Sequence, residues 1–470
     1  MKTKEKKGLA ISTRSFITSI SVIFILMVLT YILTFLIPGG AYARTTDSGG
    51  NSIIDTASGF SSVQGGIPFR KWILSPFLVL GAPDGGTITA ILVFLLIIGG
   101  VFNSLDKCGL MKYMLDKIVD RFGSARYQLL AGVSFFFMAM GAFVGSFEEV
   151  IPLVPIVVAL SVSLGWDALT GLGMSLLSVG CGFASGVCNP FTVGVAQRLS
   201  GLPVFSGIWF RAFSFVLIYG LVILFLVIHT KKIEKADGAF SGHINRIFVR
   251  NTKMDAGLRW FAGILACGIV LIISSGFIAA LQDYTMIIVL VMFLAAGISS
   301  SFVSGVKGKD FCRTFRDGMI SILPAIAMIL MAGSVKYTLV ESHVLDTILH
   351  WSVLTIDGLP KPFVILFMYL VALVINFFIP SGSAEAFLLI PLLVPIAQVC
   401  GIGAQLCIVA FAYGDGFSNV LYPTNPVLLI GLGLADVGYG QWVKYTWKFQ
   451  LANFILTSLL LLLGLAAGYR

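Results

Sequence analysis

The feature that most constrains this fold is a helix start placed inside an apolar segment. Asn189 and Pro190 interrupt SGVCNPFTVGVAQ (Ser185–Gln197), a run that otherwise resembles part of one membrane-crossing helix. Asn is a favoured N-cap and Pro a favoured first helical residue, so the pair predicts that one helix stops and another begins here. At membrane depth, the freed backbone groups need partners from protein or from a water-filled cavity. The break therefore predicts a functional site.

The same break occurs a second time. Asn425-Pro426, in YPTNPVLL, follows Asn189-Pro190 at an offset of 236 residues (425 minus 189). The same offset relates three further pairs, which are Glu149 with Glu385, Pro155 with Pro391 and Gly165 with Gly401. These matches indicate an internal duplication, which is typical of secondary transporters whose two related halves enclose a midplane site.

Composition places this duplication in a membrane. Hydrophobic residues make up 57% of the 470 residues and charged residues 11%, whereas soluble domains carry about 25% charged residues. The positive-inside rule makes the basic segments cytoplasmic and disfavours nucleic-acid binding as an explanation of the net charge of +9. These segments are Lys2 to Arg14, Lys107 to Arg126, Lys231 to Arg259 and Lys307 to Arg316.

Cysteine and histidine give no sign of metal or redox chemistry. The seven cysteines include no CxxC pair, and the four histidines form no HExxH motif. Buried thiols in helices are the simpler interpretation. We therefore expect no cofactor beyond Na⁺ as a coupling ion. The first apolar run is long enough to span and has no A-x-A-like site, so we expect a transmembrane helix rather than a cleaved signal peptide.

The chain is thus predicted to be an all-α polytopic membrane protein, an inverted-repeat transporter with two re-entrant hairpins and two interrupted transmembrane helices. We expect nine full crossings, a cytoplasmic N-terminus and a C-terminus outside. The first repeat (1–230) contains helices 15–37 and 87–105, a surface helix 107–121, a hairpin 127–165, a broken helix 167–200 and a helix 209–228. A cytoplasmic linker (231–256) precedes the second repeat (257–470). That repeat contains helices 258–279, 284–303 and 319–335, an amphipathic stretch 341–354, a hairpin 362–401, a broken helix 403–435 and a helix 445–467.

Carboxylates mark both hairpin tips and the second break. Glu148 and Glu149 lie in GSFEEVIP, Glu385 lies in PSGSAEAF, and Asp415 lies in AYGDGFSN. A charged side chain at membrane depth costs about 2.5 to 3.5 kcal/mol, which makes each a functional-site hypothesis. The same segments contain no Lys or Arg. We therefore expect an external cation: a proton, Na⁺ or a substrate ammonium group.

The broken helices predict the complementary chemistry. Each helix after an Asn-Pro pair should present unpaired N–H groups and about half a positive charge to a carboxylate. Unwound carbonyls near Ser185, Asn189, Ser418 and Asn425 could coordinate Na⁺. A site with both properties suits a zwitterion such as an amino acid. The predicted substrate and ion site comprises Ser146, Glu148, Glu149, Ser185, Asn189, Thr192, Ser381, Ser383, Glu385, Asp415, Ser418, Asn419, Thr424 and Asn425.

Structural explanations compete with these roles. An Asn-Pro pair is a common turn, and Glu149 and Glu385 could simply stabilise the first turns of hairpin helices. Asp415 could pair with a lysine across the bundle. The tip serines Ser146, Ser381 and Ser383 could serve turns only.

The motifs NPFTVGVAQ, LPVFSGIWFR, PSGSAEAF and AYGDGFSN resemble those of the YfcC family, which is related to the anaerobic C4-dicarboxylate carriers within the ion-transporter superfamily. The resemblance covers nearly the whole chain. It implies a bacterial inner-membrane carrier, commonly a homodimer, with a scaffold and a mobile domain that contains both hairpins and moves like an elevator. Its members include arginine/ornithine antiporters and dicarboxylate carriers. The tips here read SFEE and SGSAE, where symporters of the superfamily often carry Ser-Asn-Thr.

The leading hypothesis is a secondary active transporter for an amino acid, of the basic arginine or ornithine type, or for a related carboxylate-bearing metabolite. A C4-dicarboxylate carrier coupled to Na⁺ or H⁺ is the first alternative, and a passive channel is another. An intramembrane aspartyl protease is a distant one, because Ala412-Tyr413-Gly414 precedes Asp415 instead of a Gly-x-Gly sequence.

Overall fold

The computed structural model of the chain describes residues 13–46, 52–54, 59–83, 85–145, 147–236, 251–277, 284–355 and 358–469. Most of the described residues are helical, because an apolar run in a membrane satisfies its backbone hydrogen-bonding groups internally when it forms a helix. The α-helices are α1 (Thr13–Leu36), α2 (Phe69–Leu78), α3 (Gly85–Lys107), α4 (Leu110–Phe122), α5 (Arg126–Ala139), α6 (Val154–Ser163), α7 (Ala168–Leu172), α8 (Ser178–Ser185), α9 (Val195–Leu199), α10 (Ile208–Ala236), α11 (Thr252–Phe277), α13 (Thr285–Val303), α14 (Gly308–Glu341), α15 (Val344–Leu354), α16 (Lys361–Phe378), α17 (Gly382–Val399), α18 (Ala404–Ser418), α19 (Pro426–Leu434) and α20 (Tyr439–Ala466).

Short π- and 3₁₀-helical segments and small strands complete the fold. The π-helical turns are Met140–Val144, Gly173–Leu177 and Pro190–Gly194, and the 3₁₀ segments are Val79–Gly81, Gly123–Ala125 and Glu148–Leu153. Strand β1 (Gly40–Tyr42) pairs antiparallel with β4 (Phe60–Ser62), and β2 (Arg44–Thr46) pairs antiparallel with β3 (Ser52–Ile54). These strands were not predicted from the sequence.

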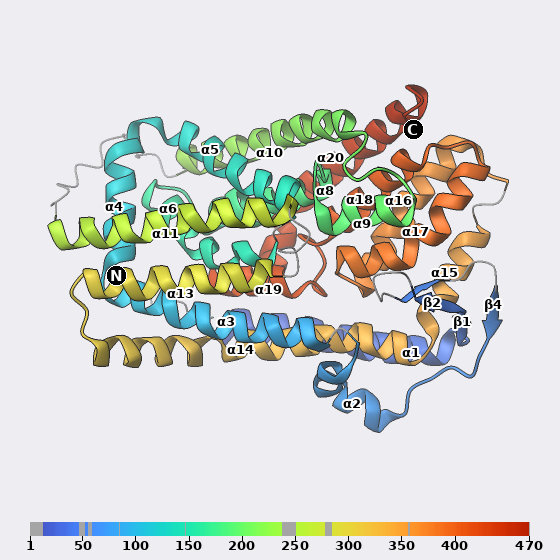
Figure 1. Cartoon of the computed structure of the whole chain (residues 1–470), viewed down its shortest axis with the longest axis horizontal. Coiled ribbons are helices and arrows are strands. Elements are labelled where there is room, and N and C mark those ends of the chain that lie inside the picture. The colour runs from blue at the N-terminus through green and yellow to red at the C-terminus, as the bar shows by residue number, and fades with distance from the viewer. Residues whose placement is uncertain are drawn as a thin grey trace.

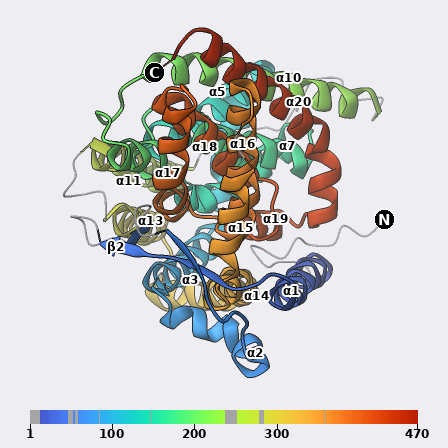
Figure 2. The ribbon, with the colours of Figure 1, turned by 90° about the vertical axis from the view of Figure 1, so that its right-hand side faces the viewer.

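The helices form two groups, and each predicted repeat contributes to both. One group contains α1, α2, α3, α11, α13 and α14, in which α14 packs on α3 and α11 on α13. The other contains α5 to α10 with α16 to α20, in which α18 packs on both α8 and α16. Figure 2 shows α1, α2, α3 and α14 below the second group, with α11 and α13 at its left-hand side and α15 between α14 and α16. The halves of the sequence are therefore intermixed in space.

Residues related by the offset of 236 adopt the same local structure at the ends of α6 and α17. Gly165 (φ 88°) and Gly401 (φ 70°) both take the left-handed conformation that favours glycine after a helix. In each case the next amide donates to the carbonyl five residues back, as Trp166 does to Ser161 (3.0 Å) and Ile402 to Ala397 (2.7 Å). The next helices, α7 and α18, then begin at Ala168 and Ala404, again 236 residues apart (404 minus 168).

Several predicted helix ends are wrong. Helix α10 continues to Ala236 and α11 begins at Thr252, so both ends of the predicted linker 231–256 are helical, while 237–250 lie outside the described residues. Helix α14 starts at Gly308 instead of 319, and α20 starts at Tyr439 instead of 445. In α10 and α14 the added turns contain Lys, Arg, Glu and Asp, so polar and charged residues extend these helices beyond their apolar cores.

Eight helices in the described part of the chain are long and apolar enough to cross a membrane. Three of them, Arg126–Val144, Lys361–Phe378 and Gly382–Val399, are arms of the predicted re-entrant hairpins. Length alone does not distinguish a re-entrant arm from a crossing, so the nine crossings and the two hairpins stay predictions. The chain is an all-α polytopic membrane protein with interrupted helices.

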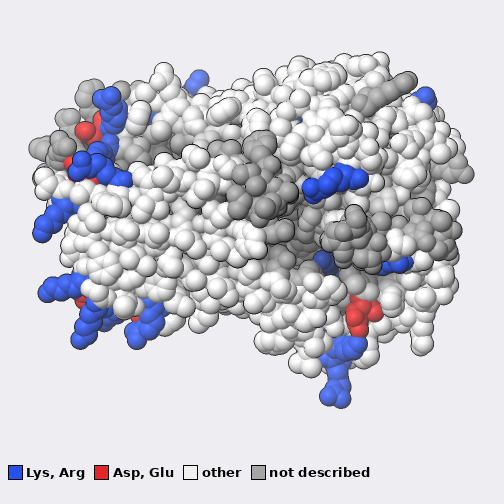
Figure 3. Space-filling model, in the orientation of Figure 1, with Lys and Arg blue, Asp and Glu red and all other residues white. Residues whose placement is uncertain are grey.

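The described basic residues of 107–126, 252–259 and 307–316 gather at one end of the long axis. Figures 1 and 3 show Lys and Arg over α4, the start of α11 and the start of α14, at the left-hand end of the view. Helix α4 lies across this end, nearly perpendicular to α3 (Figure 1), as expected for the predicted surface helix 107–121. The strands, α15 and the C-terminal end of α20 lie at the opposite end.

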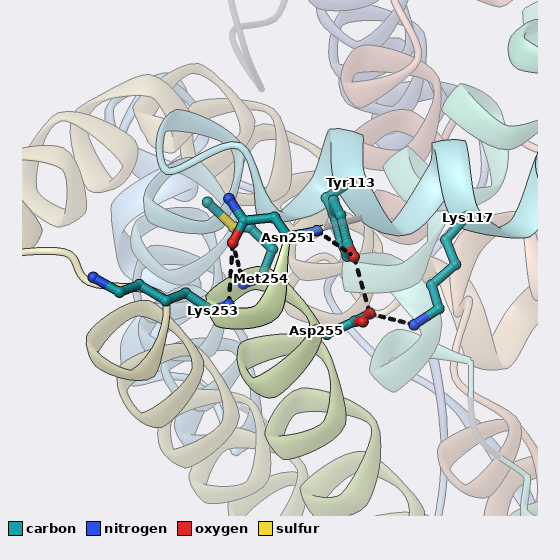
Figure 4. Close-up of polar contacts among 6 residues, drawn as sticks. All are labelled: Tyr113, Lys117, Asn251, Lys253, Met254 and Asp255. Atoms are coloured by element: carbon teal, nitrogen blue, oxygen red, sulfur yellow. Dashed lines mark hydrogen bonds and ion pairs between the residues drawn. The ribbon is translucent and has the colours of Figure 1, made fainter. Parts of the chain in front are cut away.

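Ion pairing joins α4 to α11 at the basic end (Figure 4). Asp255, with 7% of its side chain exposed, accepts hydrogen bonds from the Tyr113 hydroxyl (2.9 Å) and Lys117 Nζ (2.5 Å). Asn251 Oδ1 caps α11 by accepting from the backbone amides of Lys253 (3.0 Å) and Met254 (3.3 Å). This junction fixes the surface helix against the long helices.

Candidate substrate site in the membrane

The two predicted helix breaks are present, and each is capped by its asparagine. Asn189 Oδ1 accepts from the backbone amides of Phe191 (2.9 Å) and Thr192 (3.3 Å). Asn425 Oδ1 accepts from the two equivalent amides, those of Val427 (2.9 Å) and Leu428 (3.3 Å). The prediction that each Asn is an N-cap and each Pro the first helical residue is confirmed.

This capping corrects one expectation about the anion site. We expected unpaired amides at the two helix starts, but Pro190 and Pro426 have no N–H and the next two amides of each helix already bind the Asn cap. The partial positive charge of the helix end remains. A substrate carboxylate would therefore need other donors, such as the side-chain amide of Asn189.

A buried polar cluster lies beside the second break and is centred on Asn376 of α16. Asn376 Nδ2 donates to Glu385 Oε2 (2.8 Å) and to Asp415 Oδ1 (2.7 Å). Its carbonyl oxygen accepts from the hydroxyl of Ser418 (2.9 Å). Each of these four side chains is at most 2% exposed. The cluster thus brings together α16, α17 and α18 at the α16–α17 tip.

The cluster extends to the second break through Asn419. Asn425 Nδ2 donates to Asn419 Oδ1 (2.7 Å), and Asn419 Nδ2 lies 3.4 Å from Asp415 Oδ1. The cap of α19 is therefore linked by hydrogen bonds to the carboxylates. No Lys or Arg of the described residues pairs with Glu385 or Asp415, so the alternative of a lysine partner for Asp415 is not supported.

The first broken helix packs directly on this cluster. A Cβ built on Gly382 would lie 2.3 Å from Thr192 Cγ2 and 2.7 Å from Asp415 Oδ2. Glu148, at the other hairpin tip, is half-buried and close enough for electrostatic repulsion with Asp415. The two breaks and the described parts of both tips therefore meet in one region.

Several polar atoms in this region are buried without a hydrogen-bond partner. Two are carboxylate oxygens, Glu385 Oε1 and Asp415 Oδ2, and three are donors. The donors are Asn189 Nδ2, Thr192 Oγ1 and Thr424 Oγ1. Buried polar groups are normally satisfied, so this group of unsatisfied ones makes the region a candidate ligand site. Its acceptors and donors match the two ends of a zwitterion.

The remaining predicted residues differ in their positions. Ser185 is buried, and its hydroxyl donates to the Gly182 carbonyl (2.7 Å), a local bond within α8. Ser381 is exposed and Ser383 is half-buried, and neither joins the hydrogen-bonded cluster. Ser146 and the side chain of Glu149 lie outside the described part of the structure.

Sequence reasoning missed Asn376 and a buried cation, Arg211. Arg211, 1% exposed, uses Nε and Nη2 to contact the carbonyl of Val187 in the first break (both 3.3 Å). Its Nη1 lies near Gln405 Oε1 (3.5 Å) and the Tyr469 hydroxyl (3.4 Å). A single polar residue inside the apolar run LVALVINFF was the available signal for Asn376. For Arg211 the available signal was a single charged residue in the first turn of its helix, directly before the apolar run.

Comparison with known proteins identifies the family. The sequence model of the family described as "C4-dicarboxylate anaerobic carrier" matches residues 16–466. The chain belongs to this family. Membership in the C4-dicarboxylate anaerobic carrier family agrees with the resemblance inferred from the NPFTVGVAQ and GDGFSN motifs.

Two relatives extend this comparison. An Escherichia coli (strain K12) protein named "Putative basic amino acid antiporter YfcC" is 28% identical over 404 residues, which cover 82% of this chain and 79% of the relative. A Haemophilus influenzae protein is 24% identical over 506 residues, with 98% of each chain covered. The family is described as one of carriers, and the Escherichia coli relative is named an antiporter, so this family member is a multi-pass membrane transporter of a small molecule and is not an enzyme.

Two solved transporter structures have a weak overall resemblance to this chain. The Alcanivorax borkumensis YdaH transporter has a TM-score of 0.46 at 18% identity, and the comparison covers 97% of this chain and 99% of YdaH. Neisseria gonorrhoeae MtrF, described as one of a class of antimetabolite efflux pumps, has a TM-score of 0.45 at 18% identity, with 94% of each chain covered.

Proposed function

We propose that this chain is a secondary active transporter of the bacterial cytoplasmic membrane that moves an amino acid, of the basic arginine or ornithine type, or a related carboxylate-bearing metabolite. The observation that carries this proposal is the pair of unsatisfied, buried oxygens Glu385 Oε1 and Asp415 Oδ2. A substrate ammonium or guanidinium group would supply the missing positive charge. The unsatisfied donors Asn189 Nδ2, Thr192 Oγ1 and Thr424 Oγ1 would bind the substrate carboxylate.

The name of the Escherichia coli relative supports a basic amino acid as substrate. Transport would be driven by Na⁺, H⁺ or exchange, and oxygens near Ser185, Asn189, Ser418 and Asn425 would hold Na⁺. From the family resemblance, we propose alternating access by an elevator-type displacement in a homodimer. The moving group would be α5 to α10 with α16 to α20, which contains both tips and both breaks.

The family description favours a second candidate, a C4-dicarboxylate carrier. A dianion would meet repulsion from Glu148, Glu385 and Asp415. These carboxylates would then have to bind protons or Na⁺ before the substrate enters. The two candidates therefore differ in the cation that accompanies binding.

Thermal stabilisation of the purified protein distinguishes the candidates, because a ligand stabilises the state that binds it by mass action. We expect arginine or ornithine at a hundred times its Kd to stabilise the protein by about 2.7 kcal/mol. Glu385→Gln and Asp415→Asn, each of which removes one negative charge, should weaken this effect. Stabilisation by succinate but not by arginine or ornithine, seen only in the presence of Na⁺ or at low pH, would contradict the amino-acid proposal.

The broken helices can be tested with a matched control. Asn189→Ala and Asn425→Ala should abolish transport in proteoliposomes while membrane insertion is retained. Asn251→Ala removes the same kind of cap from α11 at the basic end, so it should cost similar stability, about 1 kcal/mol, without loss of transport. Normal transport by both break variants would refute the assignment.

A further inference from the structure

A groove of about 860 Å³ runs between α10 and α20, away from the polar cluster. Its floor is aromatic: the Phe225 ring contacts the rings of Tyr445 (4.9 Å between centroids) and Phe449 (5.3 Å). Its walls are largely apolar and include exposed side chains. Leu224 is 57% exposed, Ile228 59% and Trp447 49%. These exposed apolar residues belong to helices long enough to cross a membrane, so they face lipid.

The length of the groove along the two helices matches the thickness of one leaflet of a bilayer. On α10 it extends from Leu221 to Lys232, and on α20 from Gln441 to Ala452. Each stretch covers eleven residue steps (232 minus 221 and 452 minus 441), or about 16 Å of helix. Half of a hydrocarbon core is about 15 Å thick. An acyl chain lying in the groove would therefore match it in length.

Three lysines line the groove: Lys232 and Lys444 lie toward the end where Gln441 is, and Lys448 lies one helical turn further along α20. Lys232, Lys444 and Lys448 are exposed, and none of them pairs with a carboxylate among the residues that the structure describes. The acidic lining residue, Asp167, is already engaged by His229 Nε2 (3.0 Å) and by the Thr170 amide (2.8 Å). This end of the groove therefore presents a net positive charge.

The lysine end of the groove is the basic end of the molecule. Arg126 Nη2, at the start of α5 and separated from α4 by the 3₁₀ segment Gly123–Ala125, pairs with Glu234 Oε1 of α10 at 3.1 Å. Glu234 lies two residues after Lys232 in the same helix. The lysines thus lie at the end that the positive-inside rule assigns to the cytoplasm, where the leaflet is negatively charged.

We propose that the α10–α20 groove is a binding site for an anionic phospholipid. Its phosphate lies against Lys232, Lys444 and Lys448, and one acyl chain lies along Leu221, Leu224 and Ile228. Trp447 lies beside the headgroup, as interfacial tryptophans do. Free phosphate shares the headgroup chemistry but would leave the apolar walls unused. The site is independent of the proposed substrate, because it lies on the outer face of the helix group that holds the polar cluster.

The test measures lipid binding to the delipidated, full-length protein in dodecyl maltoside by native mass spectrometry and thermal stability. We expect dioleoylphosphatidylglycerol to bind and stabilise, and dioleoylphosphatidylcholine to do so much more weakly. Each lysine should contribute about fivefold to affinity. The triple variant Lys232→Gln/Lys444→Gln/Lys448→Gln should therefore lose about a hundredfold.

A control with the same change in charge is Lys112→Gln/Lys307→Gln/Lys309→Gln, on α4 and the start of α14, which should keep wild-type lipid affinity. Ala452→Trp fills the apolar part of the groove and should lower lipid affinity with all lysines present. Equal affinity in the two triple variants would overturn the proposal. So would equal binding of phosphatidylcholine, or stabilisation by inorganic phosphate that matches that by the lipid.

Discussion

Replacing Gly382 by alanine tests whether the α16–α17 tip rests directly on the first broken helix. The added Cβ would lie 2.3 Å from Thr192 Cγ2 and 2.7 Å from Asp415 Oδ2, whereas carbon atoms in contact are about 3.5 to 4.0 Å apart. Relief requires a shift of more than 1 Å in a packed region. Such overpacking typically costs about 1 to 3 kcal/mol.

Gly220→Ala is the matched control, because it lies within α10 and its added Cβ would meet no atom within 4 Å. Both variants gain helix propensity, so the difference in their free energies of unfolding gives the overpacking cost, about 1 to 3 kcal/mol. Unfolding in mixed micelles of dodecyl maltoside and sodium dodecyl sulfate measures it. Thr192→Ser removes the closest methyl group and should recover part of the loss. Gly382→Ala as stable as Gly220→Ala would refute the close approach.

Two predictions concern the basic end. Burial raises the pKa of Asp167, but hydrogen bonds from His229 and Thr170 outweigh it and leave the pKa below its ordinary value. The stabilisation is thus present above the ordinary value of about 3.9 and lost as pH falls through the folded-state pKa. The melting temperature of Asp167→Asn should lie below that of the wild type at pH 6, with a gap that closes as the pH falls below the ordinary value of the carboxyl and through its folded-state pKa; a constant gap would contradict this. Asp255→Ala removes the bonds from Tyr113 and Lys117 and should lower the free energy of unfolding by about 1.5 to 3 kcal/mol. An unchanged value would show that the α4–α11 junction does not depend on this carboxylate.

The helix breaks could be predicted because capping is local. Asn followed by Pro determines the start of a helix within a few residues, so the starts at Pro190 and Pro426 were found without any knowledge of packing. The glycine turns after α6 and α17 are local in the same way. Helix ends at the membrane surface were less accurate, because the change from apolar to polar residues marks the edge of the bilayer and not the end of the helix.

The centre of the polar cluster could not be found from sequence spacing. Asn376 precedes Glu385 by nine residues and Asp415 by 39, and only the packing of α16 on α17 and α18 brings the three together. Arg211 likewise reaches Val187 through a contact between α10 and the first break. The repeat itself was misleading here. The offset of 236 places Asn376 opposite Met140 and Asp415 opposite Val179, so these two cluster residues have no polar counterpart in the first half, whereas Glu385 has Glu149.

The unpaired carboxylates beside Asn376 have a consequence for the empty carrier. An uncompensated charge within a bilayer costs about 2.5 to 3.5 kcal/mol. If this cost adds to the activation barrier for reorientation of the empty carrier, that reorientation is about 60 to 400 times slower. A carrier whose Glu385 and Asp415 lack a positive partner would therefore rarely return unloaded. Each reorientation would need a cation in the site, whether a second substrate molecule, Na⁺ or a proton. Strict counter-transport would then follow from the charge of the vacant site, with no additional gate.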